Sequence, residues 1–449
     1  TMVRKGCHNL QHPFPRKIRL IMSKSLHHIV IVGGGAGGLE LATQLGERFG
    51  RRKKARITLV DQNLTHIWKP LLHEIAAGSL NPHEEQTNYF AHAEKHHFEF
   101  VLGTLTRVNK AQKQINLTPP QLSKEHVPLI QSLHYDTLIL AVGSVSNDFG
   151  TEGVREHCHF LDSRQQADLF QQDLFHLYIE AQHQSKERTL NIGIVGAGAT
   201  GVELAAELIE TTKNFYRYGL KKINPKQVKI TLIEASDRIL PALNEKTAAH
   251  STKQLKKMGI EVLTQHKVQK VDDANVYFSN GTRIHSDITV WAAGVKAPKV
   301  LESFTDFKRD KINRLMVYAT LQTHSDPNVF AFGDCANCQL DAHQPPLGPR
   351  AQVASQQATF LVDAMAARLS GSAQPMFNFS DKGSLVSLSR NQAVGELLGD
   401  VNVQGVIAKT MYVSLYRLHQ AAIHGYTQAG MLTMKDFLTR RVRPKIKLY

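Results

Sequence analysis

Two stretches of the chain repeat the same order of apolar and polar positions. Each begins with a short apolar run, at residues 29–32 and 192–195, which predicts a buried strand. A glycine-rich turn follows each run, and a segment with helical character follows each turn. Second strands are expected at residues 55–60 and 228–233. This order of strand, turn, helix and strand predicts two copies of one α/β unit, each built on a parallel sheet.

The two turns read GGGAGG at residues 33–38 and GAGATG at residues 196–201. Both have the GxGxxG spacing of a dinucleotide site, in which backbone N–H groups at a helix N-terminus face a pyrophosphate. Two such turns in one chain favour two dinucleotides held together, as in a flavin enzyme that a nicotinamide reduces. The glycines expected at the cofactors are Gly33, Gly35 and Gly38 in the first turn, and Gly196, Gly198 and Gly201 in the second.

An acid stands at the end of the second strand in each unit. Asp61 lies 23 residues after Gly38, close to the spacing of a carboxylate that binds a ribose hydroxyl. Glu234 lies 33 residues after Gly201, which predicts a longer helix or exit loop in the second unit. Both acids are therefore candidate ribose ligands.

Several further segments fit this plan. The apolar runs 136–143 and 287–294 end at Gly143 and Gly294, as buried central strands should. Strands at 393–398 and 401–406 are joined by Gly399-Asp400, a hairpin signal. A proline-bearing loop is expected between 118 and 132. The last expected element is a helix over residues 405–424, with Ile407, Met411, Leu415, Leu418 and Ala422 on one face.

Composition narrows the class of protein. A length of 449 residues allows two or three domains, and four cysteines do not make a disulfide framework, which favours a reducing compartment. The formal charge of +15 suits anionic lipid or phosphate-bearing cofactors, and no nucleic-acid motif accompanies it, so no nucleic-acid partner is expected. No run of apolar residues is long enough to span a bilayer as a helix.

The two ends of the chain differ in character. The polar first 21 residues lack the apolar core of a secretory signal, and Met22 is the expected native start, with a disordered tail as the alternative. Residues 435–449 carry six Lys or Arg against one Asp, interleaved with apolar residues. This pattern favours a basic amphipathic anchor on a membrane surface over a solvated terminus or a dimer contact.

More specific segments resemble a known family. Residues 329–336, ending in Gly333-Asp334, are similar to the second flavin motif of the two-dinucleotide flavoprotein reductases. Residues 68–78, 291–295, the AQVASQQA stretch 351–358 and the DKGSL stretch 381–385 resemble segments of the type II NADH:quinone oxidoreductases. The resemblance covers residues 26 to 449.

This resemblance implies a non-pumping flavoenzyme that oxidises NADH and reduces ubiquinone or menaquinone through FAD. It implies an α/β fold with two Rossmann-like dinucleotide-binding domains, as in glutathione reductase, and a C-terminal α+β membrane-associating region. The expected enzyme is peripheral, on the cytoplasmic face of a bacterial inner membrane, and homodimeric. The expected divisions are a tail at 1–24, an FAD domain at 25–150 and 300–375, an NADH domain at 151–299, and a membrane and quinone region at 376–449.

Residue roles follow from the resemblance. Asp61 and Asp334 would hold FAD, and Glu234 would bind the NADH ribose and repel a 2′-phosphate, a preference that Arg238 weakens. Glu203 matches an acid near the flavin and nicotinamide, although the helix dipole alone would also favour an acid there. Further cofactor contacts are expected from Lys69, Gly143, Gly294 and Gly333, and quinone contacts from Gln352, Gln356, Gln357 and Lys382, of which Gln352 and Lys382 are expected to act in catalysis together with Glu203.

Other readings of the chain compete with this one. Cys335 and Cys338 have the C-x-x-C spacing, but packed thiols are favoured over a redox pair or half a zinc site. His92, His96 and His97 have ligand spacing, but exposed histidines are favoured and no metal is expected. A sulfide:quinone oxidoreductase, a soluble NADH-dependent ferredoxin or disulfide reductase, and a flavin-binding signalling protein remain as alternative functions.

Overall fold

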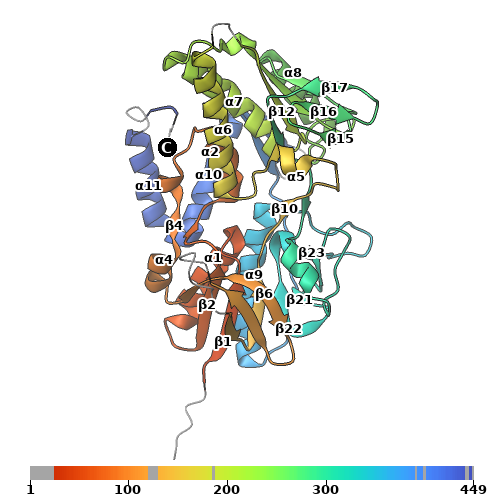
Figure 1. Ribbon diagram of the computed structural model, residues 1–449. Coiled ribbons are helices and arrows are strands. Elements are labelled where there is room, and N and C mark those ends of the chain that lie inside the picture. The colour runs from red at the N-terminus through yellow and green to blue at the C-terminus, as the bar shows by residue number, and fades with distance from the viewer. Residues whose placement is uncertain are drawn as a thin grey trace, which may run out of the picture.

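Two sheets form the body of the molecule, one in each half of the view in Figure 1; the first is parallel except for β21, and the second is parallel throughout. The computed structural model describes residues 25–119, 130–184, 188–389, 392–397, 401–439 and 444–446. Residues 1–24, with the expected start at Met22, and the centre of the expected 118–132 loop lie outside these ranges.

The first sheet is eight-stranded and combines two distant parts of the chain. Its order is β23-β20-β21-β22-β9-β1-β2-β5, so strands from residues 315–338 complete a sheet begun by residues 27–140. The central strand β1 is fully buried beyond its first residue, which explains why it has no polar alternation. The strands are β1 His27–Val32, β2 Ala55–Asp61, β5 Glu99–Leu102, β9 Thr137–Leu140, β20 Leu315–Val317, β21 Gln322–Thr323, β22 Asp326–Ala331 and β23 Ala336–Cys338.

The second sheet repeats this plan with five parallel strands in the order β11-β18-β12-β13-β14. The strands expected from the sequence are present in both sheets, and their apolar runs are buried. The strands are β11 Cys158–His159, β12 Leu190–Val195, β13 Val228–Ile233, β14 Glu261–Leu263 and β18 Ile288–Trp291.

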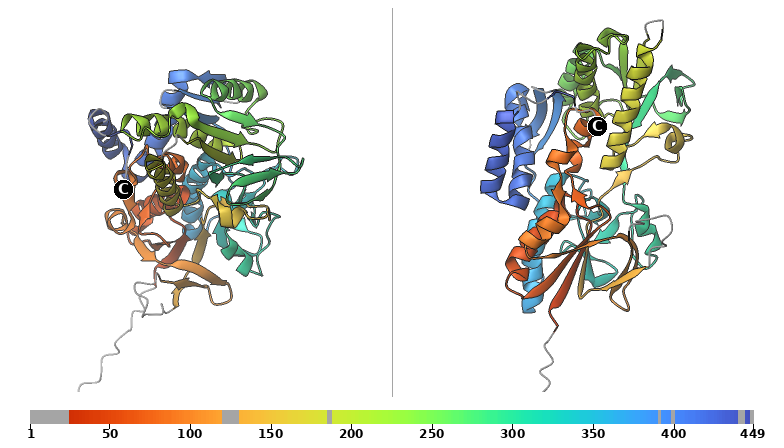
Figure 2. Two further views of the ribbon diagram at one scale, coloured as in Figure 1. Left: turned by 45° about the horizontal axis from the view of Figure 1, so that its top comes forward. Right: turned by 60° about the vertical axis from the view of Figure 1, so that its left-hand side comes forward.

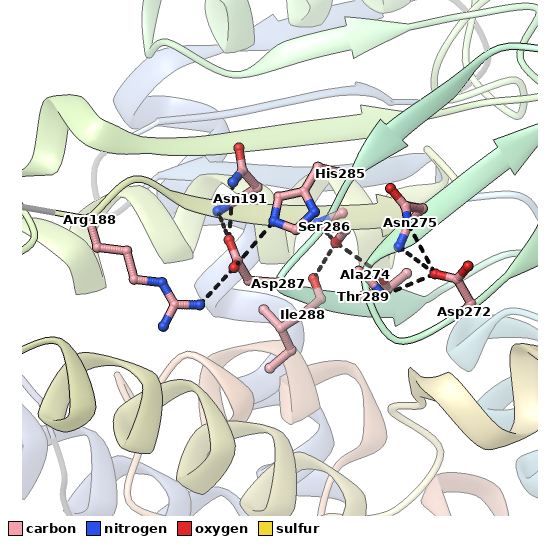
Figure 3. A network of polar contacts seen from close by, with 11 residues as sticks. Arg188, Asn191, Asp272, Ala274, Asn275, His285, Ser286, Asp287, Ile288 and Thr289 are labelled. Atoms are coloured by element: carbon pink, nitrogen blue, oxygen red, sulfur yellow. Dashed lines mark hydrogen bonds and ion pairs between the residues drawn. The ribbon is translucent and has the colours of Figure 1, made fainter.

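A polar network fixes the start of the second sheet (Figure 3). The Asp287 carboxylate accepts hydrogen bonds from the Asn191 backbone N–H at 2.7 Å and from Arg188 at 2.7 Å. Although burial opposes ionisation, these donors keep the pKa of Asp287 below its usual value. The network joins the start of β12 to the start of β18, at the end of the sheet opposite the glycine turn. Because the two strands are parallel and start together, their carboxyl ends lie side by side at the glycine turn.

Helices α1 and α7 begin at the two glycine turns, α1 directly after β1 and α7 directly after β12 (Figure 1). Helix α9 packs against α1. The bounds are α1 Ala36–Leu45, α7 Ala199–Arg217 and α9 Ala351–Ser370.

The C-terminal part consists of a small antiparallel sheet and a pair of helices. Strands β24 Ser384–Ser389, β25 Gln392–Leu397 and β26 Val401–Gln404 precede helix α10 Gly405–His424 and helix α11 Tyr426–Thr439. The antiparallel pairing of the expected hairpin and the expected helix over 405–424 are confirmed, although the second strand ends at Gln404 and the Gly399-Asp400 turn lies outside the described ranges. Figure 2 shows both helices along one side of the molecule.

The apolar face expected on α10 points outward. Ile407 and Leu418 are 70% and 58% exposed, whereas Ala408 and Ile423 on the opposite face are buried. Helix α11, which the sequence pattern did not predict, extends this surface with Phe437. No helix within the described ranges is long and apolar enough to cross a bilayer.

The expectation for residues 435–449 is wrong in one respect. Ile446 is only 4% exposed and belongs to the core around the second sheet, where it lies against Gly78. Its position beside other buried apolar residues removes it from any surface-lying anchor. Residues 440–443 and 447–449 lie outside the described ranges.

Candidate functional site

The two glycine turns have the same geometry. Gly33 and Gly196 both adopt a left-handed backbone, with φ of 106° and 102°. A Cβ on Gly38 would collide with the Gly33 carbonyl oxygen, and a Cβ on Gly201 with that of Gly196. Because hydrogen alone fits these places, the helix can start directly at the end of the strand.

Open space lies in front of each helix. Gly35 and Gly198 are the N-cap residues of α1 and α7, neither cap is closed by a side chain, and a Cβ on either glycine would meet no atom within 4 Å. The amides of the first helical turn therefore face room that a pyrophosphate would fill. This arrangement fits two dinucleotides, one at each turn.

The two expected ribose acids occupy equivalent positions. Asp61 accepts a hydrogen bond from the Gly34 N–H at 2.6 Å, and Glu234 accepts one from the Ala197 N–H at 2.9 Å. Burial raises the pKa of Asp61, against the effect of the Gly34 and Asn63 amides. Each turn is thus tied to the acid at the end of the neighbouring strand, which places a carboxylate beside the open space.

Two further glycines of the first unit gather at the same edge. Strands β9 and β22 are neighbours of the sheet, and Gly143 and Gly333 follow their ends. Asp334 accepts a hydrogen bond from the Ser144 hydroxyl at 2.8 Å, and the Lys69 ammonium donates to the Ser144 carbonyl at 2.8 Å. The expected contacts of the first cofactor therefore lie together. Gly294 follows β18 at the corresponding edge of the second sheet.

Two of the expected quinone residues, Gln352 and Gln356, use their side-chain amides to bond the backbone of residues 380–383. Gln352 donates to the Gly383 carbonyl at 2.9 Å and accepts from the Lys382 N–H at 3.2 Å, and Gln356 bonds both backbone groups of Ser380. They hold the segment before β24 against α9, and Lys382 itself is exposed.

Gln357 lies elsewhere. It is 1% exposed, and its side-chain oxygen accepts the Gly333 N–H at 2.8 Å. It therefore supports the Gly333-Asp334 turn that follows β22, and its buried amide does not share the surface of Gln352 and Lys382.

Glu203 lies in the first half of α7 and is buried, with 6% exposure. One carboxyl oxygen accepts the Ser387 N–H at 2.9 Å, and the other lies 3.4 Å from Nδ1 of His73. Burial raises the pKa of Glu203 to about 8, although the Ser387 amide, Tyr412 and Lys409 lower it. Within the described part of the chain, no hydrogen bond or ion pair joins Glu203 to Gln352 or Lys382, but Ser387 is on the strand that follows Lys382.

Sequence reasoning missed three side chains at the site. Tyr89 and His66 both donate to the Gly34 carbonyl, at 2.7 and 2.9 Å, and so fix the first glycine turn. His73 stands between two acids, as described below. Of these three residues, only His73 could have been found from the sequence, because it stands next to Glu74 within the 68–78 segment that resembles the family.

The expectation of exposed histidines is wrong for two of the three. His92 and His96 are 4% and 8% exposed, because α4 Tyr89–Lys95 packs their rings together beneath α10, whereas His97 is exposed. Within the described ranges, no group of three or more His, Cys, Asp or Glu is placed to hold a metal ion. Cys335 and Cys338 are buried free thiols.

This fold and these paired turns define a flavoprotein-type pyridine nucleotide enzyme, and the comparisons agree. The chain belongs to the pyridine nucleotide-disulphide oxidoreductase family, whose sequence model matches residues 27–358, and within it to the type II NADH:quinone oxidoreductases. The type II NADH:quinone oxidoreductase of Haemophilus influenzae is 41% identical over 94% of this chain and 100% of its own length. That of Staphylococcus aureus is 28% identical over 84% of this chain and 91% of its own.

Solved structures share the fold. NDH2 from Plasmodium falciparum in complex with NADH has a TM-score of 0.81 at 20% identity, covering 94% of this chain and 100% of that one. A sulfide:quinone oxidoreductase from Aquifex aeolicus has a TM-score of 0.69 at 16% identity, covering 93% and 96%. The fold is thus common to both classes, and sequence identity assigns the chain to the first.

Proposed function

We propose that the chain holds FAD at the first glycine turn, binds NADH at the second, and reduces ubiquinone or menaquinone. The observation that carries this proposal is the pair of equivalent turns, each with an open helix N-terminus and an acid, in a member of this family. Bound FAD would supply the redox chemistry, taking a hydride from NADH and returning two electrons to the quinone.

The test is the visible spectrum of the purified protein. A flavin spectrum that NADH bleaches, and that a short-chain quinone then restores under anaerobic conditions, is the expected result. A preparation without flavin after reconstitution, or a flavin that NADH leaves oxidised, would contradict the proposal.

The first turn and its neighbours would hold FAD. The amides at the start of α1 would face the pyrophosphate, and Asp61 would accept hydrogen bonds from the adenosine ribose. Asp334 would bind the ribityl chain. Lys69 would hold the loop at Ser144 beside the flavin, as its 2.8 Å contact there suggests.

Glu234 would set the preference for NADH. In a Glu234→Ser variant, we expect the ratio of kcat/KM for NADPH to that for NADH to rise by about tenfold or more, because a carboxylate no longer repels the 2′-phosphate. Steady-state rates with both nucleotides measure this ratio. The matched control is Asp237→Ser, since Asp237 is an exposed acid of the same loop; an equal change in both variants would contradict the role.

Gln352 and Gln356 would shape the quinone site by holding residues 380–383, and Lys382 would offer its positive charge there. Gln357 would not contact the quinone; it would instead position Gly333, whose N–H its side chain accepts. The proton of Glu203 would be available to the same region.

We further propose that the outward apolar face of α10 and α11 docks on the anionic cytoplasmic surface of a bacterial inner membrane, and that the enzyme is a peripheral homodimer. The exposed side chains of the two helices and the charge of +15 support membrane docking. Family membership supports the dimer, which analytical ultracentrifugation would test.

The membrane surface predicts the effect of two substitutions. Phe437 and Leu438 are 78% and 66% exposed, so the double variant Phe437→Ser/Leu438→Ser should fold normally. We expect its partition onto phosphatidylglycerol vesicles to fall roughly 100-fold, since each large apolar side chain contributes about 1.5 kcal/mol or more when buried. Co-sedimentation measures the partition. Leu169→Ser, which changes an exposed leucine on α6 Arg164–Gln182, is the control, and equal binding of all three proteins would rule out this surface.

A further inference from the structure

We propose that a row of four side chains, the half-buried Glu85 and Glu74 and the buried His73 and Glu203, carries a proton from a surface pocket to the quinone site. The inference rests on the proposed function, since oxidation of NADH by a quinone takes up one proton from solution: NADH, quinone and H⁺ give NAD⁺ and quinol. A buried site that consumes a proton needs a route for it.

The inner end of the row is Glu203. The groups that face it come from every neighbouring element: His73 and Glu74 from α2 Leu72–Ala76, Glu207 from α7, and Lys409 and Tyr412 from α10. Among them Lys409 is the one permanent cation, and its ammonium donates to the Ser387 hydroxyl at 2.6 Å. Burial raises the pKa of Glu203 and Lys409 lowers it, and the residue lies next to the strand that leads back to Lys382.

His73 connects Glu203 with Glu74. The ring is 2% exposed, with Nδ1 3.4 Å from a Glu203 oxygen and Nε2 4.0 Å from a Glu74 oxygen. Nε2 has no hydrogen-bond partner among the described residues. Burial, assisted by Lys409, lowers the pKa of His73 to about 3, so the resting ring is neutral and has one nitrogen free to accept a proton. The ring also bonds the Pro70 carbonyl, and since Nε2 has no partner in the described part of the chain, this bond comes from Nδ1. Receipt at Nε2 and release from Nδ1, once its N–H turns from Pro70 to Glu203, would pass a proton from Glu74 to Glu203.

Glu74 is the next acid of the row, with an oxygen 4.0 Å from Nε2 of His73. Burial raises its pKa, Glu207 and Glu85 raise it further, and Lys409 opposes them. A carboxyl whose pKa is raised in this way holds a proton more readily than an exposed one.

The outer end is Glu85, the last residue of α3 Pro82–Glu85. Its carboxylate accepts the Tyr416 hydroxyl at 2.5 Å, and burial raises its pKa although Arg417 and Lys435 lower it. Glu85 lines a surface pocket of about 190 Å³ between α3 and the helices α10 and α11, which Asp436 also lines. A volume of this size has room for several waters, which would link Glu85 with solution. Glu74 does not line the pocket, but it is close enough to Glu85 for the charge of Glu85 to raise its pKa.

The experiment separates the two half-reactions of the flavin-loaded enzyme by stopped flow. In Glu85→Gln we expect bleaching by NADH to keep its rate and reoxidation by a short-chain quinone to slow by roughly tenfold or more at pH 8, with a larger solvent deuterium isotope effect. A small weak acid such as acetate should restore most of the rate. Tyr416→Phe should slow reoxidation less, since the carboxyl remains.

Glu84→Gln is the matched control, because Glu84 lines the same pocket but its carboxylate lies 3.8 Å from the Lys435 ammonium. If Glu85→Gln reoxidises as fast as Glu84→Gln, or slows without rescue by acetate, the row is not the proton route. If instead the unmodified enzyme is bleached by NADH but never reoxidised by quinone, the proposed function itself fails.

Discussion

A Gly201→Val variant is expected to keep its flavin and to lose its reduction by NADH. A side chain at this position would strike the Gly196 carbonyl oxygen and displace the second turn, while the first turn, in the other sheet, stays intact. A displacement of about 1 Å in a binding loop costs on the order of 100-fold in rate, so we expect bleaching by NADH to slow at least that much. Stopped-flow absorbance of the flavin band measures the change.

The matched variant is Gly38→Val, which makes the same collision with the Gly33 carbonyl in the first turn. It should yield colourless protein, because the FAD site is lost before any reaction. If Gly201→Val also loses its flavin, or if Gly38→Val remains yellow, the assignment of one dinucleotide to each turn is wrong.

The paired turns were predictable because their signal is local. Each apolar run is buried on both faces of a parallel sheet, and each turn obeys a backbone constraint that acts within six residues. The acids Asp61 and Glu234 follow from the same logic, since a parallel neighbour strand must end at the same edge. Helix α10 was predictable from its periodicity alone, although periodicity does not say whether its apolar face meets the core or solvent.

The rest of the site depends on contacts between distant segments. Gln352 and Gln357 stand five residues apart on one helix, yet one clamps the segment before β24 and the other holds Gly333. His92 is buried because α10, more than 300 residues further along the chain, covers it. Ile446 reaches the core of the second unit for a similar reason. Such placements follow from packing that no single stretch of sequence specifies.

Replacement of Lys382 by Met tests the quinone site, because Lys382 is expected there from the sequence and lies in the segment that Gln352 and Gln356 hold. Negative charge develops on the quinone oxygens during reduction, and removal of one positioned donor to such a charge costs roughly 100-fold. Since the side chain is exposed and only the backbone of Lys382 bonds Gln352, the substitution should leave the fold intact. We expect the rate of flavin reoxidation by quinone to fall by that factor, with bleaching by NADH unchanged and Lys382→Arg retaining most of the activity. Equal slowing of both half-reactions would place Lys382 at the flavin instead, and an unchanged rate in Lys382→Met would remove it from the site.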